Sequence, residues 1–346
     1  MTALGRIRLL REYACGPEGG LFYADEVLGI DGYVTMQARR LATLAGVQQP
    51  FAKAQLLLQE LCGWQLDDET IRRLTHATAK EASVRRPQRR DAQRFAAASG
   101  EIEVPIDAGK VNTLDGWRDV KIALFSKRET GEAATPAQWD QRELPAPTIR
   151  TVIAAIEDAA TFGERLRAEA ARLGTLMAAA LSVLGDGAEW IWNLTEEVFP
   201  QADCVLDAYH AIEHISDTAK AIWDVGTEAT NTQVEAGRMA LLTDGKRGLE
   251  RWLGTAFATV PENRSTDPLL SLAAYFAKHP TRLGYAARLA AGQSIGSGAV
   301  EGAVKQLINL RLKRTGARWR AEHVGPLVEL IALSDTPEWA EFWTAV

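Results

Sequence analysis

Three acidic residues at the ends of predicted core elements carry the clearest chemical signal in this chain. Asp107 follows one predicted strand, Asp186 follows another, and Glu301 lies near the start of a late predicted helix. The three acids are separated by 79 and 115 residues, so only the fold can bring them together. Side chains at strand ends project into a solvent-accessible crevice, which is where ligands bind in α/β sheets. The pattern therefore predicts one shared carboxylate site.

Carboxylate oxygens are hard ligands that suit Mg²⁺ or Mn²⁺ better than Zn²⁺. Two such ions, about 3.5–4 Å apart, stabilise both the attacking and the leaving oxygens of an in-line phosphoryl transfer. Simpler roles for the same acids stay open. Asp107 could occupy a turn, Asp186 could cap a helix, and Glu301 could pair with Lys305 one helical turn later.

A basic segment follows Glu301 in a chain whose net charge is −6. No second acid occurs before Glu322. A local positive run beside a lone carboxylate is typical of a metal-binding acid next to a phosphate backbone, and the alternative is a solvated basic helix face. The candidate DNA-binding residues of this segment are Lys305, Arg311, Lys313, Arg314 and Arg318.

A second polar cluster lies in the segment DCVLDAYHAIEH. His210, Glu213 and His214 match the H-x-x-E-H pattern of inverted zinc peptidases, in which both histidines bind zinc. The pattern is short, and no third ligand is evident at a suitable position. Cys204 lacks the paired C-x-x-C of a structural zinc site. We therefore favour an ordinary surface or core histidine at His214.

Composition indicates a folded protein without a membrane span. The chain has 346 residues, which is long enough for two or three domains. Its content of 47% hydrophobic and 24% charged residues is ordinary for a folded protein. No run of 18 apolar residues and no signal pattern is found. Three scattered cysteines indicate a reducing compartment. We expect a cytoplasmic protein.

The first part of the chain, residues 1–98, is predicted to be a helical domain. Helical spacing of apolar residues continues on both sides of a break at Cys62-Gly63-Trp64, and Asp67 or Asp68 can cap the second helix. This pattern indicates a helix-turn-helix, with a plain helical hairpin as the alternative. The candidate DNA contacts are Arg72 and Arg73 on the second helix, followed by Arg85, Arg86, Arg89 and Arg90 in a basic linker.

The pattern changes to strands in residues 99–208. Two strands joined near Asp115-Gly116 are followed by a third strand, a helix, a strand, a helix and a last strand. This order predicts an α/β fold with a mixed sheet flanked by helices. Residues 209–291 form a predicted all-α insertion. Residues 292–346 complete the core with the helix that carries Glu301 and a final helix.

Two long motifs, GDGAEWIWNLTEEVFPQADCVLDAYHAIEHI and GSGAVEGAVKQLINLRLKRTGARW, resemble those of the bacterial ISKra group of insertion-sequence transposases, relatives of the Mutator-type enzymes. The resemblance covers nearly the whole chain. It implies an RNase H-like catalytic domain whose acidic triad is Asp107, Asp186 and Glu301, with an all-α insertion before the last acid. One departure is Ala108 between Asp107 and Gly109, where the family pattern has Asp-Gly directly.

The resemblance implies a DNA transposase. Two Mg²⁺ or Mn²⁺ ions on the triad would support cleavage of a strand at the element end and its transfer to target DNA. Asp207 and His210 resemble a motif that assists this chemistry. The implied partner is double-stranded DNA, bound by a homo-oligomer in the bacterial nucleoid, with no membrane contact. The alternatives are a domesticated or inactive DNA-binding protein, and an RNase H-like nuclease without strand transfer.

Overall fold

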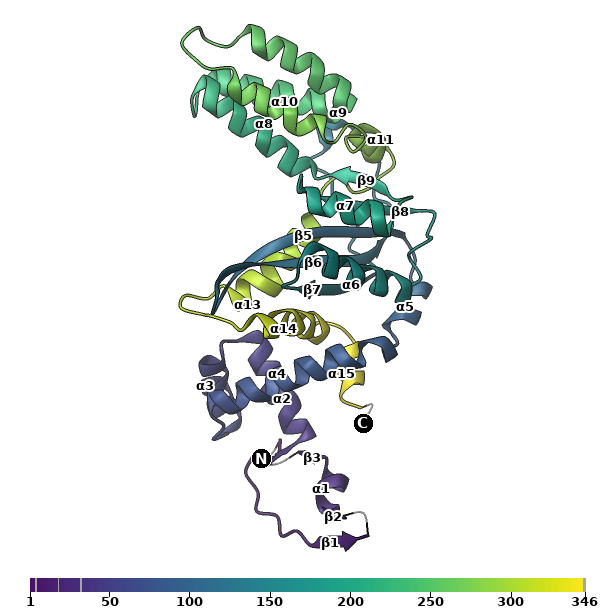
Figure 1. Ribbon diagram of the computed structural model, residues 1–346, viewed down its shortest axis with the longest axis vertical. Helices are drawn as coiled ribbons and strands as arrows, with labels where there is room; N and C mark the ends of the chain where they lie inside the picture. The colour runs from purple at the N-terminus through teal and green to yellow at the C-terminus, as the bar shows by residue number, and fades with distance from the viewer. Residues whose placement is uncertain (4, 18, 32, 345–346) are drawn as a thin grey trace.

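A five-stranded mixed sheet lies at the centre of the computed structural model, which describes residues 1–3, 5–17, 19–31 and 33–344 (Figure 1). Its strands are β5 (Glu101–Thr113), β6 (Gly116–Arg128), β7 (Ile149–Ala155), β8 (Leu181–Gly185) and β9 (Asp203–Leu206). They lie in the order β7-β6-β5-β8-β9. The pairs β5–β6 and β6–β7 are antiparallel, whereas β5–β8 and β8–β9 are parallel. The predicted α/β class with a mixed sheet is confirmed.

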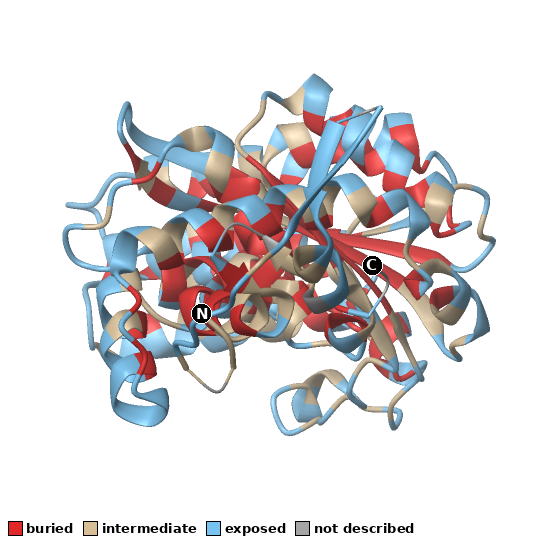
Figure 2. Cartoon of the chain, turned by 90° about the horizontal axis from the view of Figure 1, so that it is seen from below, coloured by how far each residue is buried: buried red, intermediate tan, exposed pale blue. Residues whose placement is uncertain are grey.

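Helices cover both faces of the sheet because its inner strands alternate between two apolar surfaces. On β6, Ala123 and Phe125 face one buried cluster, while Ile122 and Leu124 face another. Buried residues gather along the central strands and on the helix sides that face them (Figure 2). Helices α6 (Ala159–Arg172) and α7 (Glu189–Val198) pack in the first cluster. The second cluster holds α12 (Gly298–Ala303), the π-helix η3 (Val304–Asn309), α13 (Leu310–Leu312) and α14 (Ala321–Ser334).

The long β5–β6 hairpin corrects two details of the prediction. The turn residues are Leu114 and Asp115, one position earlier than predicted, and Gly116 follows with a φ of 95°. Asp107 lies within β5 rather than at its end. The strand continues to Thr113 because β6 pairs with it from Ile106 to Thr113, beyond the end of its pairing with β8 at Pro105.

The insertion consists of helices joined by loops and extends from one end of the sheet (Figure 1). It follows β9 directly, at the edge of the sheet. In α9 the left-handed Gly245 interrupts the helical backbone, so the long helix is kinked there. The helices are α8 (Ala208–Trp223), α9 (Glu228–Ala258), α10 (Asp267–Ala277) and α11 (Tyr285–Ala290).

The N-terminal part combines helices with two short hairpins that were not predicted. The helices α2, α3 and α4 pack on one another, and α4 also packs on α14. Their bounds are α1 (Tyr23–Leu28), α2 (Met36–Gln48), α3 (Phe51–Cys62), α4 (Asp68–Arg85), η1 (Arg86–Gln88) and α5 (Asp91–Ala97). The hairpins are β1 (Tyr13–Gly16) with β2 (Gly19–Phe22), and β3 (Ile30–Asp31) with β4 (Val34–Thr35). The remaining short helices are η2 (Pro136–Gln138) and α15 (Glu338–Phe342).

Two predicted boundaries between α3 and α4 are confirmed. Gly63 ends α3 in the left-handed conformation, and Asp67 caps α4 by accepting a hydrogen bond of 2.7 Å from the Thr70 amide. The two helices thus form a hairpin with a short turn, as both interpretations of this segment require.

The predicted helix that carries Glu301 is irregular in the structure. It begins only at Gly298, and six of its residues form a π-helix, a form often found at functional sites. The π-helix packs closely on β5 at Gly109, where an added Cβ would lie 2.9 Å from Ile308 Cδ1 and 3.2 Å from Val304 Cγ1. The glycine therefore permits the close approach.

Gly109→Val is expected to destabilise the fold by about 1–3 kcal/mol, because the added methyl groups overpack the contact between β5 and the π-helix. Denaturant unfolding measures the loss. Lys110→Val is the matched control, since Lys110 is exposed and pairs with Asp119 at the surface. Equal stability of the two variants would contradict the close packing at Gly109.

Candidate active site

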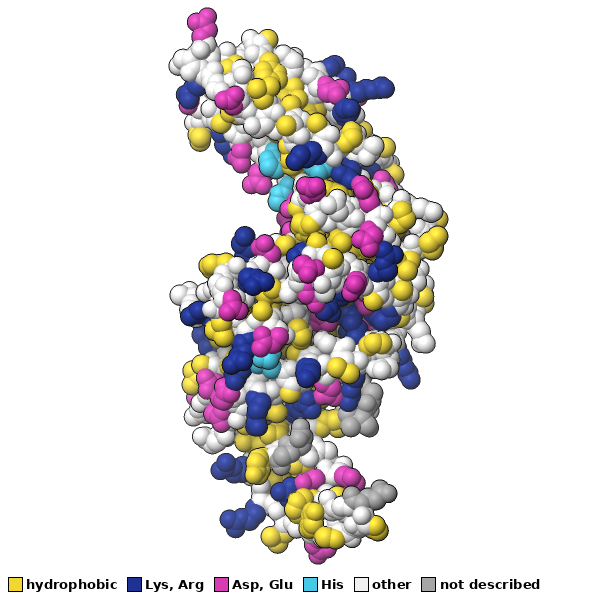
Figure 3. Space-filling view, in the orientation of Figure 1, with side chains coloured by type: hydrophobic (Ala, Val, Ile, Leu, Met, Phe, Trp, Pro, Cys, Tyr) yellow, Lys and Arg dark blue, Asp and Glu magenta, His cyan; other side chains and the backbone are white. Residues whose placement is uncertain are grey.

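The three predicted acids line one open cleft of about 780 Å³. Asp107 comes from β5, Asp186 from the segment after β8, and Glu301 from α12. Helix α8 of the insertion forms the facing wall with Tyr209 and His210. The space-filling view shows a hollow between the insertion and the sheet, with acidic and histidine side chains along its wall (Figure 3).

Strand register explains why two of these acids meet. The parallel pairing of β5 with β8 ends at Pro105 and Leu184, and the same register two residues on sets Asp107 beside Asp186. Carboxyl ends of parallel strands share one edge of a sheet, which is where α/β proteins bind ligands. Each paired residue of β5 lies beside the residue 79 positions later in β8. Asp107 and Asp186 are separated by the same number of residues.

Asp107 is half-buried, and its Oδ1 accepts a 2.7 Å hydrogen bond from the Ala108 amide. Burial raises the pKa of this carboxyl from 3.8 to about 6, although the amide opposes the rise. The charges of Asp186 and Glu301 raise this pKa further, whereas His210 lowers it. Negative charge is therefore concentrated here in a partly desolvated space.

Asp186 lies in the turn before α7 and does not cap that helix, whose N-cap is Ala188. Its Oδ1 accepts a 2.8 Å hydrogen bond from the Ala188 amide just before α7, and its side chain lines the cleft. The next residue, Gly187, lies against Tyr275 of α10, since an added Cβ would be 2.3 Å from the ring. The insertion thus packs directly beside the second acid.

Glu301 faces the cleft from α12 rather than lying on an outer face with Lys305. Its Oε1 is 3.8 Å from Nε2 of His210. Burial raises the pKa of Glu301 and the charge of Asp207 adds to this effect, while His210 and a hydrogen bond from Ser297 oppose it. The imidazole of His210 also lies 3.6 Å from Glu213, so it sits among acids.

Asp207 acts on the site through other residues, which corrects its predicted catalytic role. The side chain is fully buried and caps α8 by accepting a 2.9 Å hydrogen bond from the His210 amide. Its other oxygen accepts hydrogen bonds from the amide and hydroxyl of Ser297, directly before α12. Asp207 therefore fixes the helix of His210 relative to the helix of Glu301, as a positioning residue.

The donor chemistry of the cleft fits a hard divalent cation, since three carboxylates from separate elements face the same space. Their side chains are not drawn together around one point: within the described ranges, no group of three or more His, Cys, Asp or Glu residues is arranged to hold a metal ion. Binding an ion through all three acids would thus require side-chain or helix movement. His214, the other histidine of the peptidase pattern, packs against Tyr275 in a tilted arrangement with the ring centroids 4.2 Å apart.

Four of the basic residues predicted after Glu301 are exposed, namely Lys305, Lys313, Arg314 and Arg318. The prediction for Arg311 is wrong because its side chain is buried. Its guanidinium donates hydrogen bonds of 3.0 and 2.8 Å to the Gly46 carbonyl and lies over the rings of Phe51 and Trp319. Burial and the charge of Arg314 lower the pKa of Arg311 to about 10. It joins the Glu301 segment to the N-terminal helices.

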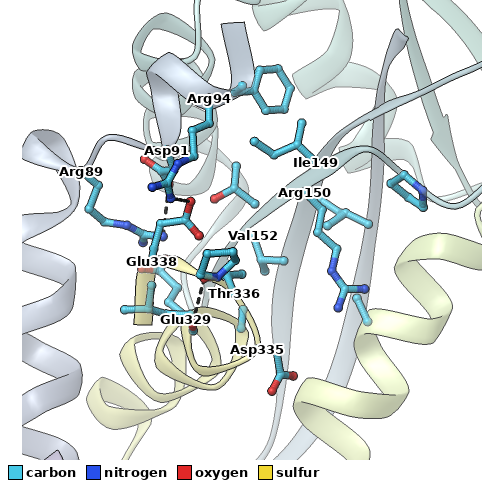
Figure 4. Close-up of a pocket in the computed structure, with 18 of the residues that line it drawn as sticks. Arg89, Asp91, Arg94, Ile149, Arg150, Val152, Glu329, Asp335, Thr336 and Glu338 are labelled. Carbon is cyan, nitrogen blue, oxygen red and sulfur yellow. Dashed lines mark hydrogen bonds and ion pairs between the residues drawn. The ribbon is translucent and has the colours of Figure 1, made fainter. Parts of the chain in front are cut away.

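The basic linker is likewise only partly a surface feature. Arg86 is buried between Glu169 and Glu329, so it cannot contact DNA in this fold. Arg89 is mostly buried and pairs with Asp91 at 3.1 Å. Both arginines line a pocket of about 540 Å³ between α5, β7 and α14. Figure 4 shows Arg89 at the wall of this pocket.

The other predicted arginines remain near the surface. Arg90 and Arg73 are exposed. Arg72 is partly exposed and pairs with Glu69 in its own helix, and Arg85 pairs with Glu81 at 2.6 Å.

One polar residue of the cleft was missed in the sequence. Asn309 lines the cleft at the end of the π-helix, and its buried Oδ1 has no hydrogen-bond partner in the described part of the protein. It follows Glu301 by eight residues, a spacing that places two side chains on similar faces of a helix, so helical periodicity could have suggested it.

Comparison with known protein families finds no match, and comparison with curated proteins finds none either. Among the residues that the structure describes, no helix combines the length and apolar character needed to cross a membrane.

The raised pKa of Asp107 gives a testable pH dependence. A carboxyl whose pKa rises from 3.8 to about 6 on folding favours the folded state below pH 3.8, and this contribution is lost as the pH rises through 6. The side chain in Asp107→Asn has no titrating proton, and its amide oxygen can still accept the hydrogen bond from the Ala108 amide. The variant should therefore exceed the parent in unfolding free energy by about 2–3 kcal/mol at pH 8, and the gain should shrink towards pH 4.

Urea unfolding across this pH range measures the difference. Asp115→Asn, in the exposed turn between β5 and β6, is the control and should show no comparable trend. A gain for Asp107→Asn that is the same at pH 4 and pH 8 would contradict a raised pKa at this position.

Proposed function

We propose that this protein is a DNA transposase, a metal-dependent polynucleotidyl transferase with an RNase H-like core. The observation that carries the proposal is the meeting of Asp107, Asp186 and Glu301 in one cleft, from three segments far apart in the sequence. These are the three acids that the resemblance to ISKra-group transposases assigns to the catalytic triad.

The order of elements supports the finer fold class. An antiparallel β5-β6-β7 unit is followed by α6, β8, α7 and β9, with β8 and β9 added in parallel beside β5. The helical insertion then intervenes before α12, which brings the last acid back to the sheet. An RNase H-like domain with an all-α insertion before its third acid has this arrangement.

The electrostatics of the cleft support a cation-dependent reaction. Burial and neighbouring acids raise the pKa of both Asp107 and Glu301, so a bound cation would relieve charge that the protein leaves uncompensated. When bound, Mg²⁺ or Mn²⁺ would activate water or a 3′-hydroxyl and stabilise the leaving oxygen. Asp107, Asp186 and Glu301 are the proposed ligands.

His210 and the basic segment are proposed to position the DNA. The His210 imidazole lies at the cleft wall beside Glu301, within reach of a phosphate that entered the cleft. The exposed cations after Glu301 can neutralise neighbouring phosphates. Pairing of two element ends requires more than one catalytic site, so we propose a homo-oligomer on DNA.

A plasmid that carries the DNA flanking the gene on both sides provides the test. Incubation with the purified protein and Mg²⁺ or Mn²⁺ should give strand breaks at the flanks and joined products with a second plasmid, and EDTA should abolish both. Breaks without joined products would favour an RNase H-like nuclease. Tight DNA binding without breaks would favour a DNA-binding protein that has lost its chemistry.

A further inference from the structure

The first eleven residues carry positive charge that the proposed chemistry does not use. Arg6, Arg8 and Arg11 occur in this segment, and the first acid in the sequence is Glu12, although the whole chain has a net charge of −6. Residues 5–11, here called the N-terminal arm, precede β1 without regular structure from Arg6 onward. Arg6 and Arg8 are exposed, which makes the arm a candidate surface for an anionic partner.

The arm forms one wall of a groove of about 1050 Å³, and α4 forms another. From α4 the groove is lined by Thr70, Arg73, Leu74 and Ala77, whose spacing of three and four residues is that of one helical face. The β3–β4 hairpin closes the groove with Tyr33, a residue that is 84% exposed. This groove lies apart from the carboxylate cleft, since none of its lining residues belongs to the sheet or the insertion.

Charge in the groove is strongly unbalanced. Four arginines line it against one acid, Asp67, whose carboxylate is engaged in capping α4. Arg11 pairs with Asp25. Within the described residues, Arg6, Arg8 and Arg73 form no ion pair, so three cations stay available to a ligand.

We propose that this groove binds the sugar–phosphate backbone of duplex DNA, held between the N-terminal arm on one side and α4 on the other. The inference rests on the proposed function in taking DNA as the partner. A phosphate backbone fits because unpaired arginines and a phenolic hydroxyl are typical backbone contacts, and because α4 is the second helix of a hairpin beside the groove. The groove would supply affinity, while the cleft performs the chemistry.

The test uses the full-length double variant Arg6→Ala with Arg8→Ala. Its affinity for a synthetic duplex of gene-flanking DNA is measured between about 50 and 200 mM salt. Each phosphate contact contributes about 0.9 to the slope of log affinity against log salt, so the slope should fall by about 2. Adding Arg73→Ala should lower it by about 1 more. Unchanged thermal unfolding shows that the fold is kept, as expected for exposed side chains.

The control is Lys246→Ala with Arg247→Ala, which removes the same charge from exposed positions on α9, at the opposite end of the molecule (Figure 1). Its salt slope should equal that of the parent protein. An arm variant with the parent slope overturns the inference, as does a parent protein that binds no duplex at the lowest salt. Poly-glutamate at matched charge is then added as a competitor of the duplex. If it competed as strongly as DNA does, the groove would bind an acidic protein partner instead, which also overturns the inference.

Failure of this inference is distinguishable from failure of the proposed transposase. Arm-dependent DNA binding without any metal-dependent strand breaks would support the groove and contradict the chemistry. Strand breaks with a salt slope that does not depend on the arm would support the chemistry and contradict the groove.

Discussion

Asp107→Asn, Asp186→Asn and Glu301→Gln are each expected to reduce metal-dependent DNA cleavage on the order of 10³-fold or more. Each substitution keeps the size of the side chain and removes one negative charge from the cleft. The three acids come from β5, the end of β8 and α12, so no neighbour in sequence can replace a lost carboxylate. Rates of strand breakage on the flanking-DNA plasmid, at saturating Mg²⁺, measure the effect.

DNA affinity separates this effect from a general loss of function. Each variant should bind the duplex at least as tightly as the parent, because removing a carboxylate lowers the repulsion of phosphates. Asp217→Asn is the matched control, since Asp217 is an exposed acid on α8 that pairs with Lys220 away from the cleft lining. Full cleavage activity in any one of the three variants would remove that acid from the proposed ligand set.

The sequence supports the prediction of the sheet and its acids because both depend on local patterns. Alternation of polar and apolar residues predicts β5, and short apolar segments bounded by turns or helices predict the other strands of the sheet. Asp107 and Asp186 are predicted as ligands because side chains at strand ends project into a solvent-accessible crevice, although Asp107 in fact lies within β5. What no local pattern contains is the register between β5 and β8, which comes from packing across the sheet. That register decides that these two carboxylates are neighbours.

The buried arginines show where sequence reasoning fails. Arg311 and Arg86 each lie in a strongly basic segment, so both resemble surface cations. Their interior partners are far away in sequence: Arg311 reaches the Gly46 carbonyl, and Arg86 reaches Glu169 and Glu329. Charge counts along the chain therefore overestimated the basic surface.

Asp207 shows a second limit of sequence reasoning. The sequence predicts that Asp207 lies near the acids, but not that it holds α8 and α12 in position. The parallel pairing of β8 with β9 ends at Gly185 and Leu206, and one further step in that register sets Asp207 beside Asp186. An acid beside Asp186, just past the end of a strand, matches the sequence pattern expected of a metal ligand. Only the packing of the loop at Ser297 against it reveals that its oxygens are already occupied.

Arg86→Met is expected to lower the unfolding free energy by about 3–5 kcal/mol, the cost of leaving a buried charge without its partner. The Arg86 guanidinium bonds Glu169 at 2.8 and 3.1 Å, lies 3.1 Å from Glu329 and donates to the Val152 carbonyl at 2.7 Å. It thereby connects the end of α4 to α6, β7 and α14. Arg172 also binds Glu169, so Glu329 is the acid left without a cation.

The pKa of Glu169 describes how strongly this network holds its charges. Burial acts to raise that pKa, but hydrogen bonds from Arg172 and Arg86 outweigh it and hold the pKa at about 2, below the ordinary 4.5. A depressed carboxyl pKa stabilises the fold above pH 4.5, and the contribution is lost as the pH falls towards 2. The network therefore favours folding across the neutral range.

Urea unfolding at pH 7 tests this role against Arg90→Met, which removes an exposed arginine four residues away and should change stability by no more than about 0.5 kcal/mol. Arg86→Met combined with Glu329→Gln should recover part of the loss, because the second change removes the uncompensated charge. If Arg86→Met were as stable as Arg90→Met, Arg86 would have to be solvated, and its assignment as a DNA contact would become tenable again. Recovery in the double variant would instead fix Arg86 as the interior link between the N-terminal helices and the sheet.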